Sequence, residues 1–375
     1  MIKVEIDNEM LSPLLSIERA KERFGGIRLP IALMNKLRKS SKKRSSYASN
    51  RIEGNPLSEA QANDAIESSR RHYLKPEQEV RNYFKALEFL EQALKVKAPV
   101  SKDLILKVQA MVVKGEPPEK TGFRGPMPPG VLFAVYDDKT GGTEYIPPEA
   151  GELEGLVEEL VRYVETSDDH PIIKAAVVHY QLVTIHPFED GNGRTSRLMS
   201  DYVLDLGGYG FNQIGSLEEY FAYDIDEYYR SLQMGLPALY YDGRENPPHP
   251  EIWFKYFLRM MELHANKAVE TVCDKTKAAD EAGRSYLNFK ERKFLDYLRQ
   301  HKLTTFAPVE LARPMKVSNR TIINWCAALV KNGFLVPDFA GERIRSYSLT
   351  SLGHDEGCSG LNLGYMKSFA ADWTQ

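Results

Sequence analysis

The chain has 375 residues and a formal net charge of −3, from 49 basic and 52 acidic side chains. This length predicts two or three domains, and the near balance of charge argues against a bulk electrostatic partner for the whole chain. No apolar stretch approaches the roughly 20 residues of a membrane-spanning helix, and Met1–Asp7 lacks the pattern of a signal peptide. The cysteines Cys273, Cys326 and Cys358 show no metal-ligand spacing. We therefore expect a cytoplasmic protein with no membrane partner.

The N-terminal third is expected to be helical. Polar and apolar residues follow a helical period over Pro56–Arg71, Gln78–Ala93 and Val100–Val113. The basic stretch Lys36–Arg44 could contact nucleic acid, but a solvated helix face is the preferred interpretation. A helix is expected to end near Ser49–Gly54, because glycine suits the left-handed position that closes a helix.

A β-hairpin is expected between Gly122 and Pro148, a segment rich in glycine and proline. The apolar run Val131–Tyr136 is prone to form a strand, Asp137–Gly142 predicts a turn, and Thr143–Ile146 predicts a returning strand. Such a hairpin could either pack against the core or offer a free edge to a partner.

Three helices are expected next, over Gly151–Val164, Pro171–Ile185 and Thr195–Leu206. The middle one has the continuous apolar character of a buried helix, and the others are amphipathic. Between the last two helices, His186–Arg197 holds an imidazole, two carboxylates, two glycines, an amide and two guanidinium groups. Buried charges are costly unless they are paired, so this composition excludes an ordinary core segment.

Each residue type in His186–Arg197 suits a site for phosphate and metal. An imidazole can accept a proton near neutral pH, and Asp190 offers the hard oxygen that Mg²⁺ prefers beside nucleotide phosphates. Gly191 and Gly193 let backbone N–H groups turn onto an anion at the start of a helix, where the helix dipole favours negative charge. The guanidinium groups fit phosphate oxygens, and the Asn192 amide can donate to a phosphoryl oxygen.

The pattern resembles the signature of the Fic family, His-x-Phe-x-(Asp/Glu)-Gly-Asn-Gly-Arg-x-x-Arg, and every specified position is filled. The resemblance implies transfer of AMP from ATP, with Mg²⁺, to a Ser, Thr or Tyr hydroxyl of a target protein. By this resemblance His186 is the catalytic base and Asp190 the metal ligand. The residues implied to bind the phosphates of ATP are Gly191, Asn192, Gly193, Arg194, Thr195 and Arg197.

Gly193 indicates which of the reactions known in the family to expect. Some members that transfer phosphate carry lysine at this position, where its side chain would fill the space for the terminal phosphates. Glycine is expected to leave that space open, which favours AMP transfer over phosphate transfer.

An upstream segment resembles the inhibitory motif of the family, (Ser/Thr)-x-x-x-Glu-(Gly/Asn), with Ser49, Glu53 and Gly54 at the specified positions. Its place ahead of the core resembles the class with an N-terminal inhibitory helix, in which the glutamate reaches the second arginine, here Arg197. The resemblance thus implies an enzyme that is autoinhibited at rest. It also allows the reverse removal of AMP, and a homodimer, since relatives often dimerise.

Two further segments take a role from the same resemblance. The predicted hairpin would be the flap on which the target protein docks by strand addition. Tyr228 and Tyr229 match the adenine-side helix of relatives, although packing in the core is the alternative.

The polar stretch Lys267–Arg284 is expected to be a connecting helix or a linker, and a different pattern follows it. The following order of elements resembles a winged helix-turn-helix, with helices over Phe289–Gln300, Pro308–Ala312 and Asn319–Lys331 and two strands within Phe334–Leu349. Residues 285–350 carry 11 basic and 5 acidic side chains, a local net charge of +6. This excess suits DNA phosphates, although winged helices also serve protein contacts and dimerisation.

The sequence therefore predicts a mainly α protein, with a Fic helical core and a β-hairpin flap followed by a small α+β winged helix-turn-helix domain. The expected divisions are an N-terminal region with the inhibitory helix (1–115), the catalytic core (116–270), the winged helix (285–350) and a tail (351–375). The expected function is an autoinhibited protein adenylyltransferase. The alternatives are a Fic phosphotransferase and a DNA-binding regulator whose Fic core senses nucleotide.

Overall fold

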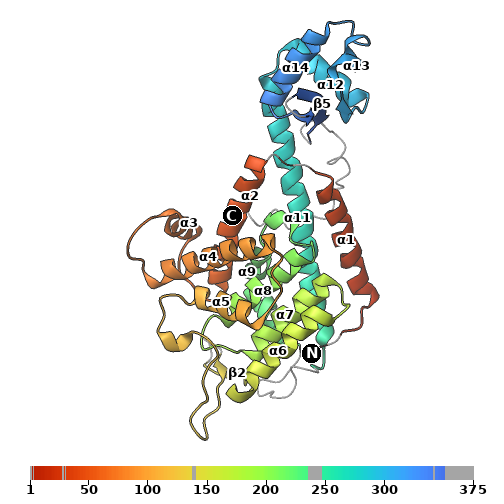
Figure 1. Cartoon of the computed structure of the whole chain (residues 1–375). Coiled ribbons are helices and arrows are strands. Elements are labelled where there is room, and N and C mark those ends of the chain that lie inside the picture. Colours follow the sequence, from red (N-terminus) through yellow and green to blue (C-terminus); the bar gives the residue numbers. More distant parts are fainter. Residues whose placement is uncertain are drawn as a thin grey trace. The chain divides into compact units, whose positions relative to one another are not determined.

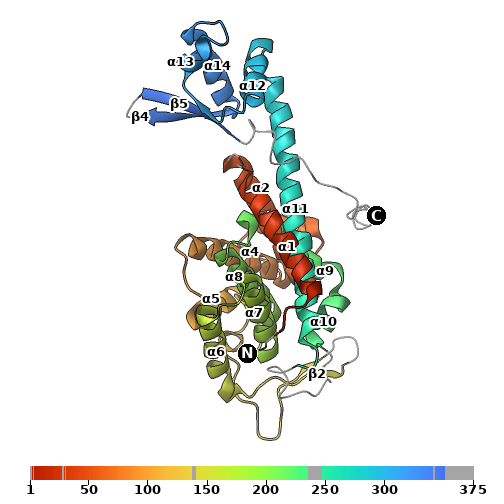
Figure 2. The ribbon, with the colours of Figure 1, turned by 90° about the vertical axis from the view of Figure 1, so that its right-hand side faces the viewer.

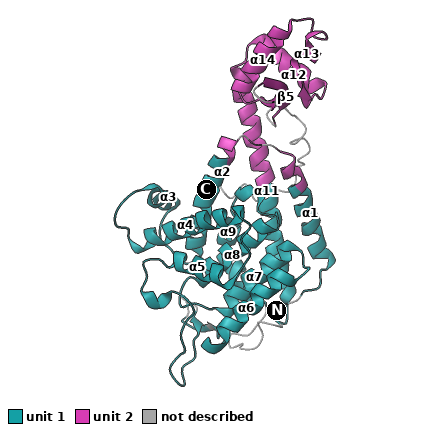
Figure 3. Ribbon diagram, viewed as in Figure 1, with its two compact units in different colours: residues 1–21, 35–267 teal, residues 22–34, 268–375 magenta. Residues whose placement is uncertain are grey.

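The computed structural model describes residues 2, 4–27, 29, 31–136, 141–234, 247–340 and 343–350. The predicted tail 351–375 and most of the predicted flap turn, 137–140, lie outside this range. The chain divides into two compact units (Figure 3), residues 1–21 with 35–267 and residues 22–34 with 268–375. Among the described residues, no helix combines the length and the apolar character that crossing a bilayer requires.

The first unit is built mainly of helices, with α4, α5 and α7 packed around α8 (Figures 1 and 2). In chain order the helices are α1 (Asn8–Gly25), α2 (Ile31–Ile52), α3 (Glu59–Glu67), α4 (Lys75–Lys95), α5 (Lys102–Val112), α6 (Leu153–Thr166), α7 (Pro171–Ile185), α8 (Asn192–Leu206), α9 (Glu218–Tyr223), α10 (Ile225–Gln233) and α11 (Pro250–Ser285). Short 3₁₀ helices occur at η1 (Pro118–Lys120), η2 (Ala150–Glu152) and η3 (Phe211–Gln213). The predicted connecting helix proves to be the second half of α11, a single helix that begins in the first unit and ends in the second.

Helix α7 has the predicted bounds, and its local sequence explains them. Pro171 supplies the fixed φ that suits the first helical position, and the side chain of His170 accepts the Ile172 N–H at 3.3 Å. Nearly all of its side chains are buried, as expected of a helix that is apolar all round.

Helix α8 begins three residues earlier than the predicted start at Thr195. Gly191 takes a left-handed φ of 81° at the N-cap, and its carbonyl accepts the Thr195 N–H at 2.9 Å. Asn192 and Gly193 therefore lie in the first turn of the helix rather than in a free loop.

The basic stretch Lys36–Arg44 lies within α2, and the prediction of a solvated face is wrong for much of it. Four of its cations form ion pairs with acidic residues of α3, α4 and α9, namely Lys39 and Lys43 with Glu67, Lys42 with Glu91 and Arg44 with Glu219. The side of α2 that packs against the unit is mostly small and polar, with Ser41, Ser45, Ser46, Ala48, Ser49, Asn50 and Ile52 buried. The helix is therefore held by polar contacts more than by apolar burial.

The predicted flap hairpin is present but shorter than expected. Strands β1 (Val135–Tyr136) and β2 (Thr143–Tyr145) pair antiparallel, with Val135 opposite Tyr145 and Tyr136 opposite Thr143. The predicted strand over Val131–Tyr136 is wrong for its first four residues, which lie in the loop ahead of β1 (Figures 1 and 2). The Val131 N–H instead closes a turn onto the Pro128 carbonyl at 3.0 Å, because the preceding prolines and glycine favour a turn over a ladder.

The second unit has its own apolar core, centred on the fully buried side chains of Phe294, Leu298, Ile322 and Leu329. Its elements are α12 (Phe289–Gln300), β3 (Thr305–Phe306), α13 (Pro308–Ala312), α14 (Asn319–Lys331), β4 (Leu335–Ala340) and β5 (Arg343–Leu349), and the antiparallel sheet has the order β3-β5-β4. The order of helices and strands is that of the expected winged helix-turn-helix.

Local chemistry explains why all three predicted helices of this unit have the predicted bounds. Asn288 forms a capping box with Glu291 at the start of α12, and the Ser318 side chain accepts the Thr321 N–H at the start of α14. Strand β3 was not predicted, because two residues are too few to show a strand period.

Candidate active site

His186 closes helix α7 in a left-handed conformation, with φ 48°. Its N–H still donates to the Leu182 carbonyl at 3.2 Å, and its Nδ1 atom lies 3.3 Å from the Val183 carbonyl. A carbonyl can only accept, so Nδ1 carries the ring proton and Nε2 keeps its lone pair. Burial lowers the pKa of His186 from 6.5 to about 4. The imidazole is therefore neutral at physiological pH and can accept a proton at Nε2.

Arg124 links the flap segment to His186 and Pro187 through hydrogen bonds, a role that was not predicted from the sequence. Its Nε donates to the His186 carbonyl at 2.8 Å, its backbone N–H donates to the Pro187 carbonyl at 2.9 Å, and its Nη2 donates to the Pro148 carbonyl. The guanidinium also covers the ring of Phe133, which lies 5.9 Å from the imidazole. No local pattern predicts this role, because these hydrogen-bond partners of Arg124 lie 24 or more residues away along the chain.

Asn192 shapes the loop between α7 and α8. Its Oδ1 accepts the Phe188 N–H at 3.0 Å, and its Nδ2 donates to the Phe188 carbonyl at 2.8 Å. One N–H of this amide remains that could donate to a phosphoryl oxygen, so the expected phosphate contact stays a prediction. Gly191 is confined as well, because an added Cβ would lie 3.0 Å from Val113 and 3.1 Å from Val112. The loop conformation is therefore set by close packing.

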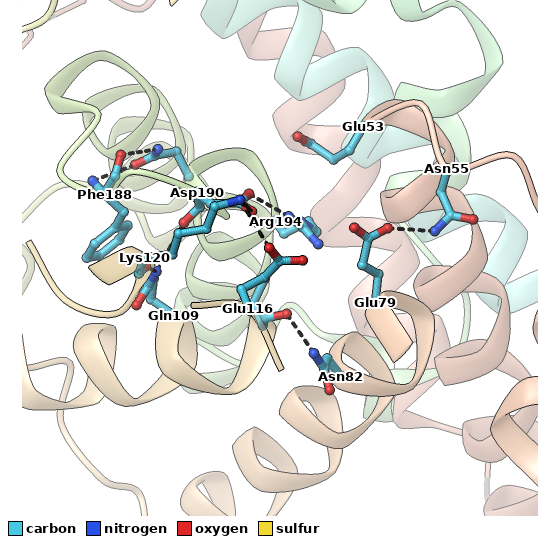
Figure 4. A network of polar contacts seen from close by, with 12 residues as sticks. Glu53, Asn55, Glu79, Asn82, Gln109, Glu116, Lys120, Phe188, Asp190 and Arg194 are labelled. Carbon is cyan, nitrogen blue, oxygen red and sulfur yellow. Dashed lines mark hydrogen bonds and ion pairs between the residues drawn. The ribbon is translucent and has the colours of Figure 1, made fainter. Parts of the chain in front are cut away.

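Asp190 and Arg194 belong to a polar network that extends to η1 and α5 (Figure 4). The Asp190 carboxylate accepts from Arg194 Nη2 at 2.8 Å and lies 3.4 Å from Lys120 Nζ, which also pairs with Glu116 at 3.1 Å. Gln109 Nε2 donates to the carbonyls of both Asp190 and Lys120. The Asp190 carboxylate is 24% exposed and contacts two cationic side chains, those of Arg194 and Lys120.

Thr195 and Arg194 each retain a polar atom that lacks a hydrogen-bond partner within the described part of the chain. These atoms are the hydroxyl of Thr195, which is fully buried, and the Nε of Arg194. Buried polar atoms are costly when unpaired, so their presence beside the Asp190 network is consistent with a site for a polar ligand.

Glu53 forms the ion pair with Arg197 that the resemblance implied. Its Oε1 accepts from Arg197 Nη2 at 2.7 Å; the arginine side chain is 1% exposed and the glutamate 30%. Burial alone would lower the pKa of Arg197, but Glu53, Tyr228 and Tyr83 together raise that pKa above its usual value. Arg197 also donates to Ser49, through Nε to Oγ at 2.8 Å and through Nη2 to the carbonyl at 3.1 Å.

The space beside Gly193 is not open, which corrects the expectation drawn from this glycine. A Cβ added at Gly193 would collide with Oε1 of Glu53 and would lie 3.2 Å from Nη1 of Arg197. The absence of a side chain thus admits the Glu53 carboxylate, which lies at the N-terminus of α8 where an anion is favoured.

The end of α2 is closed by hydrogen bonds that place Glu53 at the C-cap. Gly54 takes φ 78° and donates to the Arg51 carbonyl at 3.0 Å, and Asn55 donates to the Asn50 carbonyl at 3.0 Å. This pair of bonds is a Schellman motif, in which glycine or asparagine occupies the left-handed position. The expected glycine cap at Gly54 is confirmed, and the preceding residue, Glu53, is ion-paired with Arg197 rather than fully solvated.

The two tyrosines of α10 take different positions. Tyr228 is 1% exposed, so the core-packing alternative holds for it. Its hydroxyl lies 3.4 Å from Arg197 Nη1 and 2.8 Å from His179 Nε2. Tyr229 is 40% exposed and its hydroxyl lies 3.5 Å from the Ile52 carbonyl, so contact with a base remains a prediction for this residue.

Comparison with known proteins identifies a match to the Fic/DOC family over residues 99–204. The protein adenylyltransferase Fic of Drosophila erecta is 30% identical over 203 residues, which cover 52% of this chain and 39% of that protein. The enzyme of the same name from Drosophila grimshawi is 29% identical over 203 residues, covering 52% and 40% of the two chains. The matched region thus spans well under half the length of these relatives.

Solved structures share the fold. A Fic family protein from Desulfovibrio desulfuricans G20 superposes with a TM-score of 0.59 at 19% identity, covering 93% of this chain and 98% of that one. Fic-1 from C. elegans superposes with a TM-score of 0.55 at 23% identity, covering 72% of this chain and 73% of that one.

Proposed function

Residues 99–204 of this chain belong to the Fic/DOC family, and from this premise we propose that the protein is an autoinhibited protein adenylyltransferase. The observation that carries the proposal is the Glu53–Arg197 ion pair beside Gly193, within a complete Fic signature. A carboxylate from a distant helix occupies an arginine that is otherwise suited to phosphate.

The proposed reaction follows from the position and protonation of His186. The oxygen of a target hydroxyl forms a bond to the α-phosphorus of ATP, while the bond from that phosphorus to pyrophosphate breaks. The electron pair leaves with pyrophosphate, and the hydroxyl proton moves to Nε2 of His186, the nitrogen whose lone pair is not engaged by Val183. The backbone N–H groups at the start of α8 would stabilise the negative charge on the phosphates.

Asp190 is the carboxylate that fits Mg²⁺ in this site. It offers hard oxygens that are partly exposed and already attract two cationic side chains, Arg194 and Lys120. Proteins commonly hold Mg²⁺ by one or two carboxylates together with the substrate phosphates. When bound, the ion would neutralise phosphate charge, and Asp190 would hold it.

The target protein is proposed to dock on the flap. The loop that carries Phe133 leads directly into strand β1 of the hairpin, and the Phe133 ring lies 5.9 Å from the His186 imidazole. A peptide that adds along the hairpin edge would thus bring its hydroxyl toward the catalytic base.

Replacing Glu53 tests both the reaction and its inhibition. The Glu53→Gly variant is expected to increase AMP transfer by at least about tenfold, because it removes a carboxylate that repels the terminal phosphate, and tenfold corresponds to about 1.4 kcal/mol. The measurement is incorporation of label from ATP labelled at the α-phosphate, with Mg²⁺ and a cell extract.

The control for this experiment is Arg51→Gly, which loosens the same end of α2 without removing the carboxylate, and which is expected to release less activity. Equal incorporation by the wild type and Glu53→Gly would refute autoinhibition. Label transferred only from the γ-phosphate would instead identify a phosphotransferase.

A second candidate function, DNA binding, is favoured by the distribution of charge in the second unit. Arg284 of α11 forms an ion pair with Asp296, and Arg299 of α12 forms one with Asp280. Five other cations are exposed and form no ion pair within the described residues. They lie around α13 and α14 and on strand β5, namely Arg313, Lys316, Arg320, Arg343 and Arg345. Positive charge without an internal partner suits the phosphates of DNA.

The DNA proposal is tested with the full chain in a salt-titrated gel shift. Arg320→Ala is expected to weaken binding and to reduce the slope of log affinity against log salt by about 1. Arg162→Ala, which removes the same charge from an exposed position in the first unit, is the matched control. Absence of binding by the wild type at low salt would exclude this function.

A further inference from the structure

The buried Arg197 is held by more than the glutamate that inhibits it. Three further hydrogen bonds orient its guanidinium: Nε to the Ser49 hydroxyl at 2.8 Å, Nη2 to the Ser49 carbonyl at 3.1 Å and Nη1 to the Tyr228 hydroxyl at 3.4 Å. None of these bonds involves Glu53, so their partners stay in place when only that carboxylate withdraws.

Tyr228 is itself fixed from behind by His179. The tyrosine hydroxyl lies 2.8 Å from Nε2 of this histidine, whose ring is completely buried among the aromatic rings of Phe221, Trp253 and Phe257. Burial and the nearby Arg197 lower the pKa of His179 well below its usual value, so the ring is neutral and its Nε2 can accept a hydrogen bond from the tyrosine hydroxyl. The hydroxyl oxygen then keeps its lone pairs for the guanidinium, and the donors run from Arg197 to Tyr228 to His179.

Two N–H groups of the Arg197 guanidinium are not used by Ser49 or Tyr228. Arginine has five N–H groups, and Ser49 and Tyr228 take three of them. Of the two that remain, one on Nη2 meets Glu53, and the other belongs to Nη1, which lies 3.2 Å from the Cβ position of Gly193. One N–H on each terminal nitrogen forms the fork that binds a phosphate through two oxygens.

We propose that Ser49 and Tyr228 are positioning residues that keep the fork of Arg197 aimed at the terminal phosphate of ATP once Glu53 withdraws. This inference rests on the proposed function and deepens it. Helix α2 then has two opposed roles, because Glu53 blocks the arginine and Ser49, one turn earlier, orients it. An arginine that is already oriented loses less side-chain freedom when the phosphate binds.

The test compares the binding of ATP with the binding of AMP. All variants carry His186→Ala and Glu53→Gly, so that no transfer occurs and the inhibitory carboxylate is absent. In this background Ser49→Ala and Tyr228→Phe are each expected to raise the Kd of ATP by about tenfold or more, the usual scale for a lost hydrogen bond to a charged group. The Kd of AMP, which lacks the terminal phosphates, should stay unchanged in calorimetric titrations with Mg²⁺.

Two matched controls lie close to the residues under test. Ser46 is a buried serine of the same helix whose hydroxyl donates to the Lys42 carbonyl, so Ser46→Ala removes a comparable hydroxyl away from Arg197. Tyr256 stacks in the same aromatic cluster, and its buried hydroxyl has no hydrogen-bond partner within the described residues, so Tyr256→Phe serves for Tyr228→Phe. Both controls should leave the ratio of the two Kd values unchanged.

The proposal is overturned if either Ser49→Ala or Tyr228→Phe leaves the ATP affinity unchanged, or weakens ATP and AMP alike. Ser49→Thr keeps the hydroxyl and is expected to preserve the ATP affinity, whereas a loss equal to that of Ser49→Ala would also count against the proposal. Because these titrations need no turnover, their outcome is separate from that of the transfer assay. A Glu53→Gly enzyme that transfers no AMP would refute the proposed function and not the binding comparison.

Discussion

At His186 the backbone and the ring are both held in states that a free chain seldom adopts. The positive φ of 48° turns the chain sharply out of α7, and histidine is among the residues that tolerate this region. The hydrogen bond from Nδ1 to the Val183 carbonyl selects one tautomer, and burial keeps the ring neutral. A base with a low pKa is a weak proton acceptor, but almost every molecule carries it in the competent form at neutral pH.

Removing this imidazole should separate chemistry from binding. In the Glu53→Gly background, His186→Ala is expected to reduce AMP transfer by about 10²–10⁴-fold, the usual contribution of a general base. Binding of ATP should persist, because the phosphate-binding groups lie on α8. The measurements are labelled-AMP incorporation and calorimetric ATP titration with the same protein.

The pH dependence follows from the direction of the pKa shift. Because the pKa of His186 is lowered to about 4, the neutral form predominates above that value and is lost only as the pH falls through it. An NMR titration of the imidazole, assigned by comparison with His186→Ala, should therefore show no midpoint between pH 6 and 7. A midpoint near 6.5 would contradict the lowered pKa of His186.

At the scale of elements, the end of α2 explains why a glycine follows the inhibitory glutamate. The Schellman bonds require a left-handed residue after the C-cap, and Gly54 supplies it with φ 78°. This turn ends the helix directly after Glu53 and holds its carboxylate over the first turn of α8. The buried face of α2 is mostly small and polar, so little apolar surface would be exposed if the helix loosened.

Gly54→Ala should therefore act on activity through the helix end. A Cβ in the left-handed region costs about 1 kcal/mol, which shifts a local equilibrium about fivefold toward the state with Glu53 released. We expect basal AMP transfer to rise several-fold, measured with α-labelled ATP. Gly54→Asn, which tolerates the same φ, is the control and should change activity less. An unchanged Gly54→Ala enzyme would show that the cap does not hold Glu53 in place.

Elements also differ in how far the sequence could predict them. Helices α7, α12, α13 and α14 have the predicted bounds, because proline, asparagine and serine at their starts act through neighbouring backbone groups. The predicted strand over Val131–Tyr136 failed for its first four residues, since a strand needs a partner that local propensity does not supply. The predicted start of α8 was three residues too late. The glycines Gly191 and Gly193 favoured a loop prediction, although Gly193 lies within the helix.

At the scale of the whole molecule, two compact units each carry their own apolar core, and α11 is shared between them. The signature residues of the proposed reaction lie in the first unit, while the exposed cations that are proposed to contact DNA lie in the second. The two proposed functions can therefore be tested by substitutions in separate units of the same chain.

The amino-acid sequence alone was enough to predict the mainly helical fold class, the three helices and the last two strands of the second unit, and the full signature from His186 to Arg197. These depend on periodicity, capping and motif spacing, which act within a few residues. The resemblance named Glu53 and Arg197 as partners, but only the tertiary structure brought them together across 144 positions of the chain. It also decided that Tyr228 lies behind Arg197 and that Gly193 admits a carboxylate. Burial and pairing between distant residues arise from packing, which no local pattern encodes.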